Sequence, residues 1–150
     1  MFTRATFRRF SLLLSAALVL WGQAGQFLTV SAPGMTTATR KTTLAAKLSV
    51  QLGSGYHVVT PLRLTWNASP LQVQEIVYPK PQTRTYSFSK QPLSVYLGSF
   101  EIETRFAVPA DAPLGAAVLT GKLRYQACND TTCFQPRSVD VRLPVSIRTQ

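Results

Sequence analysis

The sequence has few of the side chains on which most catalytic chemistry depends. Its 150 residues include two cysteines and one histidine. These three side chains cannot supply the four protein ligands of a structural zinc site within one chain. A single histidine also leaves little material for a Ser-His-Asp hydrolase. We therefore expect no metal and no other cofactor.

Charged residues are also scarce, at 15%, and acids are the rarer sign, with 6 acidic against 16 basic side chains. The basic residues are scattered along the chain. They form neither a basic cluster nor the alternation of basic and aromatic residues that is typical of nucleic-acid modules. We interpret the net charge of +10 as solubility with weak attraction to anionic surfaces, and we expect no nucleic-acid partner.

The N-terminus has the composition of a targeting segment. Its first nine residues carry three arginines and no acid, and an apolar run follows over residues 10–21. That run is too short to span a bilayer core of roughly 30 Å comfortably. A signal peptide over residues 1–24, cleaved after Ala24, is therefore predicted, with Ala32 as a second cleavage candidate. The mature protein is expected in the periplasm or outside the cell; an uncleaved membrane anchor is the alternative.

The rest of the chain reads as β structure. Apolar and polar residues alternate with period two over residues 44–52, 100–108 and 139–147, and no segment after residue 24 has a helical period. Seven or eight short strands at intervals of roughly ten residues indicate an all-β domain, an immunoglobulin-like β-sandwich. We expect this domain over residues 43–150 and a spacer over 25–42.

The inward positions of these segments predict part of the core. The residues expected to be buried are Leu44, Leu48, Val50, Leu64, Trp66, Phe106, Val118, Leu123, Val141 and Val145. Pro144, on the outward face of the last segment, predicts an edge strand, because proline cannot donate to a β ladder.

The two cysteines lie close together, as Cys128 and Cys133, between two predicted strands. In an exported chain they are expected to pair. Their loop of six residues would contribute about 2 kcal/mol by loop entropy, near the low end for disulfides. The residues alone leave open a structural clip and an exchanging pair. Asp130 would raise the pKa of a nearby thiol while Arg124 and Arg137 would lower it, and the sequence does not decide between them.

One segment around the cysteines resembles a known family. Residues 125–136 read Tyr-Gln-Ala-Cys-Asn-Asp-Thr-Thr-Cys-Phe-Gln-Pro. This stretch resembles the N-terminal periplasmic domain of the thiol:disulfide interchange protein DsbD, whose members show Tyr-Gln-small-Cys, a polar spacer and Cys-aromatic-x-Pro. Residues 55–57, Gly-Tyr-His, resemble a Gly-Tyr-aromatic element of the same family. The resemblance covers about residues 44–147 and implies an immunoglobulin-like fold.

The resemblance also implies a chemistry. Domains of this family accept electrons from a thioredoxin-like domain and pass them to periplasmic disulfide isomerases. Cys133 would be the exchanging cysteine, Cys128 its resolving partner, and Phe134 part of an apolar docking surface. The exchange needs both sulfurs, because the second thiol releases the mixed disulfide that the first one forms.

The same family shields its cysteine pair with an aromatic cap. Phe88 falls near the position of that aromatic residue, and a place in the core is the alternative for it. An acidic pair precedes the aromatic residue in well-known members, whereas Tyr86 and Ser87 stand here. His57 could tune a thiol if the fold brought it near, but at the start of a strand we expect it to be merely half-exposed.

The expected partners are thioredoxin-like proteins or domains, as donor or acceptor. Because the chain ends at Gln150, any electron donor, including a membrane electron transporter, is expected to be a separate protein. The alternative function is a non-catalytic secreted immunoglobulin-like binding or adaptor domain whose disulfide is structural. The direction of electron flow is open at this point.

Overall fold

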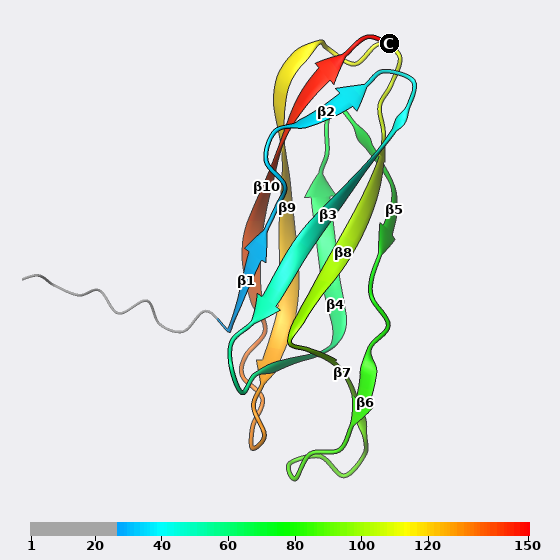
Figure 1. The fold of residues 1–150 in the computed structure, drawn as a ribbon. Coiled ribbons are helices and arrows are strands. Elements are labelled where there is room, and N and C mark those ends of the chain that lie inside the picture. Colours follow the sequence, from blue (N-terminus) through cyan, green and yellow to red (C-terminus); the bar gives the residue numbers. More distant parts are fainter. Residues whose placement is uncertain (1–26) are drawn as a thin grey trace, which may run out of the picture.

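The computed structural model describes residues 27–150, which form strands and no helix (Figure 1). Within this part of the chain there is accordingly no apolar helix that could cross a membrane. The ten strands are β1 (Leu28–Ser31), β2 (Thr36–Thr39), β3 (Thr43–Leu52), β4 (His57–Asn67), β5 (Gln72–Val77), β6 (Gln82–Arg84), β7 (Leu93–Leu97), β8 (Ser99–Ala107), β9 (Gly115–Cys128) and β10 (Arg137–Arg148).

The strands form two sheets that pack face to face (Figure 1). The smaller sheet has four strands in the order β1-β3-β8-β5, all antiparallel. The larger sheet has six strands in the order β2-β10-β9-β4-β7-β6, antiparallel except for the pairing of β2 with β10. The predicted immunoglobulin-like β-sandwich is thereby confirmed.

Period-two alternation buries one face of each sheet. In β3 every second residue is buried, as the sequence pattern predicts. The buried residues form two clusters, and Trp66 packs against both of them. Its indole Nε1 donates a hydrogen bond of 3.0 Å to Oγ1 of Thr104, a fully buried residue of the opposite sheet. This bond gives the Thr104 hydroxyl a partner in the core and joins the two sheets.

Two of the predicted core residues differ in the structure. Val118 is 46% exposed, so its prediction is wrong, and Trp66 is only partly buried. Successive side chains of a strand point to opposite faces. In β9 the inward set includes Leu119 and Leu123, which places Val118 on the outer face with Lys122. The other residues expected to be buried are buried.

The predicted spacer over residues 25–42 is wrong in its described part. It contains β1, which pairs with β3, and β2, which pairs with β10. Phe27 and Leu28 are buried in the core, so the domain begins before residue 43. Strands of four residues are too short for a sequence period to show, and their partners lie far along the chain. The predicted signal peptide, residues 1–24, lies outside the described residues.

The edge position predicted from Pro144 is also wrong for the strand as a whole. β10 lies between β2 and β9. However, β2 pairs only with residues 145–148, and Pro144 comes just before that segment. Proline has no backbone N–H to donate. At Pro144, β9 is the only described strand that pairs with β10, so this missing donor does not interrupt the pairing with β2.

Candidate functional site

A disulfide closes the loop at the end of β9. Cys128 is the last residue of β9 and is bonded to Cys133, with the two Cα atoms 4.0 Å apart. We call residues 128–133 the cysteine loop. Cys128 is completely buried, whereas Cys133 is exposed. The two halves of the disulfide therefore differ sharply in their access to another molecule.

One side chain organises the turn within this loop. Oδ1 of Asn129 accepts three hydrogen bonds: 2.9 Å from the N–H of Thr131, 3.0 Å from the Thr131 hydroxyl and 2.8 Å from the N–H of Thr132. The N–H of Asn129 in turn donates to the carbonyl of Thr132, at 2.9 Å. An asparagine side chain that bonds the backbone two residues on is a frequent turn device. The loop conformation thus has support besides the disulfide.

Phe134 anchors the chain as it leaves the loop. Its N–H donates to the carbonyl of Ala127, at 2.9 Å, and its carbonyl accepts from Nε2 of Gln126, at 3.0 Å. Its ring stacks on Phe27 with centroids 4.6 Å apart and lies edge-on to Tyr56 at 6.0 Å. These contacts are with the core, so the place of Phe134 in a docking surface stays a prediction.

Cys128 and His57 lie on the outer face of the larger sheet, the face turned away from the smaller sheet. In the β4–β9 ladder His57 is opposite Cys128, and Val58 is opposite Ala127. Val58 and Ala127 belong to the core between the sheets, so their neighbours in sequence point outward. Yet His57 is only 2% exposed and Cys128 is 0% exposed. Another part of the chain must cover them.

The cover over His57 includes residues 86–88, which we call the cap segment, between β6 and β7. The Tyr86 ring stacks on His57 with centroids 4.1 Å apart and an angle of 8°, and Phe88 stacks on Tyr86 at 5.4 Å. The Ser87 hydroxyl donates to the backbone carbonyl of Asp130, at 3.3 Å, which ties the cap segment to the cysteine loop. In Figure 1 both loops lie at the same end of the molecule.

Phe88 packs with the cap and not with the core. It belongs to neither core cluster and is partly exposed, so the alternative of a core position does not hold. Its role in shielding the disulfide stays a prediction. The residue that joins Phe88 to the site is Tyr86, because the Tyr86 ring lies between Phe88 and His57.

Sequence reasoning considered His57 as a group that could tune a thiol, but it did not predict the burial of His57 beside the disulfide. The expectation of a half-exposed side chain is wrong, and its Nε2 is buried without a hydrogen-bond partner among the described residues. Desolvation lowers the pKa of His57, and the charge of Asp130 opposes part of that shift. The pKa of Tyr86 is raised, by burial first and by Asp130 second. The sequence placed His57 at the start of a strand, but it did not show which residue would lie opposite His57 in the sheet.

The family is decided by comparison with known proteins. The family model described as "Thiol:disulfide interchange protein DsbD, N-terminal" matches residues 24–144, most of the chain. The chain belongs to this family. N-terminal domains of DsbD work in the periplasm and, in general, interact with thioredoxin-like redox partners. The resemblance carried by the cysteine motif is thereby confirmed, and the disulfide lies at the position of that motif.

Solved structures with a similar chain path include a member of this family. The DsbD N-terminal domain of Neisseria meningitidis, in its reduced form, is 17% identical, with a TM-score of 0.47 over 68% of this chain and 76% of that one. A PapD-like domain of human CEP192 is 11% identical, with a TM-score of 0.42 over 83% of this chain and 87% of that one. No curated protein matches the chain.

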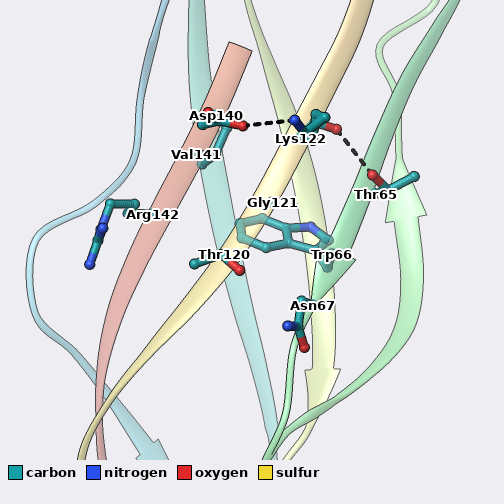
Figure 2. A pocket seen from close by; sticks show the side chains of 9 residues that line it. All are labelled: Thr65, Trp66, Asn67, Thr120, Gly121, Lys122, Asp140, Val141 and Arg142. Carbon is teal, nitrogen blue, oxygen red and sulfur yellow. Dashed lines mark hydrogen bonds and ion pairs between the residues drawn. The ribbon is translucent and has the colours of Figure 1, made fainter. Parts of the chain in front are cut away.

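One hollow on this DsbD N-terminal family member lies away from the cysteines. It measures about 510 Å³ and lies over β4, β9 and β10 (Figure 2). The Thr65 hydroxyl donates to the carbonyl of Lys122, at 3.3 Å, and the Lys122 ammonium pairs with Asp140 at 3.3 Å. Trp66 lies against Gly121, where a Cβ would come within 2.9 Å of the indole. The residues lining this hollow include no cysteine and no histidine.

A smaller hollow lies close to the cysteine loop. It measures about 380 Å³ and is lined by Pro61, Arg63, Arg124, Tyr125, Gln126 and Pro136. Arg63 and Arg124 are exposed and directly opposite each other in the β4–β9 ladder. Arg124 therefore contributes to a positive surface near the loop, while Arg137 lies over the Phe27 ring at 4.7 Å. Over residues 27–150 there is no group of three or more His, Cys, Asp or Glu residues that could hold a metal ion.

Proposed function

We propose that this protein is a periplasmic thiol:disulfide relay that exchanges electrons with thioredoxin-like partners through Cys128 and Cys133. Membership of the DsbD N-terminal family supports this function. The observation that carries it is the unequal exposure of the pair: Cys133 is exposed and Cys128 is completely buried. A partner thiolate needs access to one sulfur only, and the buried sulfur is shielded from unrelated thiols.

The exchange is a pair of thiol–disulfide substitutions. A partner thiolate attacks Sγ of Cys133; the Cys128–Cys133 bond breaks, and Cys128 leaves as a thiolate. A mixed disulfide now joins the partner to Cys133. The second thiolate of the partner attacks the partner's sulfur in that bond, and Cys133 leaves as a thiolate. The partner departs oxidised, and this domain holds two thiols. The reverse sequence passes the electron pair onward, and the difference between the reduction potentials decides the direction.

The test is to trap the mixed disulfide with a thioredoxin-like protein. Cys128→Ser leaves Cys133 without its resolving partner, so its adduct with a thioredoxin-like domain whose own second cysteine is replaced by serine should persist on non-reducing gels. Cys133→Ser should trap much less, because Cys128 is completely buried. Equal trapping by the two variants would contradict the assigned roles.

The alternative is a binding or adaptor domain in which the disulfide is a structural clip. The dense hydrogen bonding around Asn129 and the anchoring of Phe134 favour it, since they would also suit a permanent loop. A relay should have a reduction potential of roughly −120 to −270 mV, and a structural bond one below about −300 mV. No trapping by either variant, with a potential in the lower range, would establish the clip.

We also propose that a signal peptide over residues 1–24 directs the chain to the periplasm. Removal after Ala24 would leave Phe27 and Leu28, which are buried in the domain, in the mature protein. Cleavage after Ala32 would remove both, together with β1. The first site is therefore the one compatible with the folded domain.

A further inference from the structure

The exchange described above leaves one buried polar group unused. Nε2 of His57 is buried and makes no hydrogen bond with the described residues. Such groups are rare in native proteins, and each one needs an explanation. His57 is the cross-strand partner of Cys128. Side chains of directly opposed residues share a face, with Cβ atoms about 4.5–5.5 Å apart.

The surroundings of the His57 imidazole are largely apolar. The Tyr86 ring covers it from the cap segment, and Leu97 is its partner on the β7 side. The ionisable groups that face this region are Asp130 in the cysteine loop, Cys128 on β9, and Tyr86, which itself lies near Arg84 of β6. Since both His57 and Cys128 are buried, a proton on Cys128 has little direct access to solvent.

We infer that His57 is the proton acceptor for the Cys128 thiol when Cys128 resolves the mixed disulfide. This inference rests on the proposed relay function. In the step, the Cys128 S–H proton moves to Nε2 of His57, and the resulting thiolate attacks Sγ of Cys133. The bond between Cys133 and the partner breaks, and the Cys128–Cys133 bond forms. The partner leaves as a thiolate, and the imidazolium loses its proton to solvent or to that thiolate.

The electrostatics of the site suit this role. Desolvation lowers the pKa of His57 below its ordinary value, so the imidazole is neutral at neutral pH and can accept a proton. Asp130 opposes part of this shift and would stabilise the imidazolium once it forms. The reverse reaction uses the same atoms: the imidazolium protonates Cys128 as it leaves. His57 thus supplies a proton-transfer group at the position opposite the resolving sulfur.

The test follows the resolving step with a probe that needs no identified partner. Reduced protein is mixed with 5,5′-dithiobis(2-nitrobenzoate). Attack by Cys133 releases one coloured thiolate, and attack by Cys128 on the adduct releases the second. The rate of the second release is measured between about pH 5 and 8, where a histidine titrates. His57→Phe keeps a ring against Tyr86 but cannot accept a proton, and His57→Asn keeps a polar group; circular dichroism and thermal unfolding check that both variants fold.

In the unchanged protein we expect the second release to become independent of pH above the His57 pKa. In both variants it should be about 10²-fold slower at neutral pH and should rise tenfold per pH unit. Because the chain has a single histidine, its NMR titration in the reduced protein is unambiguous, and its midpoint should coincide with that of the rate profile. This comparison needs no variant.

Two results would overturn the inference and differ in what they leave standing. If the rate profiles of the variants match that of the unchanged protein, or if the two midpoints disagree, His57 is not the acceptor, and the relay function survives. If the unchanged protein releases the first thiolate but never the second, Cys128 does not resolve, and the relay function fails together with the inference.

Discussion

At the scale of single residues, the two sulfurs differ because of where the strand ends. Cys128 is still in the β9 ladder, opposite His57, and is completely buried, whereas Cys133 comes after the turn and is exposed. The turn that separates them depends on Asn129, whose Oδ1 accepts three hydrogen bonds. We expect these bonds to keep the two sulfurs close together and thereby to favour the oxidised form.

Asn129→Ala should therefore make the disulfide easier to reduce. Losing the turn contacts frees the loop in the dithiol state, so we expect the potential to become less negative by on the order of 20 mV, equivalent to about 1 kcal/mol. Equilibration with a glutathione redox buffer measures this shift. Thr131→Val removes only one of the three bonds and should shift the potential less. An unchanged potential in Asn129→Ala would mean that the turn is held by other contacts.

At the scale of elements, the site is made where β4, β9 and the β6–β7 connection meet. The β4–β9 register sets His57 opposite Cys128, and a register shift between Val59 and Arg63 separates this end of β4 from the rest. The cap segment then covers the outer face there, with Tyr86 on His57 and Ser87 bonded to Asp130. The six-stranded sheet thus carries a covered patch at one end of its outer face.

Phe88→Ala should make the disulfide more accessible to small thiols. Without the ring that stacks on Tyr86, the cap segment loses packing and should open more often, so reduction by dithiothreitol should be several-fold faster. Alkylation quenching followed by mass spectrometry gives the rate. Phe88→Tyr keeps the ring and serves as the control. Equal rates for the three proteins would show that Phe88 does not limit access.

At the scale of the whole molecule, the disulfide lies outside the main sources of stability. The two core clusters and the Trp66–Thr104 bond join the sheets, and Cys128 belongs to neither cluster. A relay must also remain folded in its dithiol form, because it spends part of each cycle there.

The double variant Cys128→Ser, Cys133→Ser should consequently fold. The loop closed by the bond contributes about 2 kcal/mol by chain entropy, so the melting temperature should fall by roughly 5–10 °C. Circular dichroism during heating measures this change, and a cooperative transition with a β spectrum is expected. A chain without cooperative unfolding would show that the bond is required for the fold.

Local sequence patterns were sufficient to predict most of the long strands, much of the core and the family of this protein. Alternation over β3, β8 and β10 predicted strands with a buried face. Successive side chains of a strand point to opposite faces, so a strand with one buried face alternates apolar and polar residues. The expected export of the chain predicted that the two cysteines pair, and the motif around them indicated the family. Most of the core list followed from the same alternation.

The tertiary structure alone decided the features that depend on distant partners. β1 and β2 are strands because they pair with β3 and β10, and not because of a pattern in their own residues. His57 is buried opposite Cys128 only because β4 and β9 pair in that register and the cap segment folds over them. Sequence periodicity specifies which residues share a face of one strand. Which residue lies opposite, and which loop covers the face, depends on contacts between segments far apart in the chain.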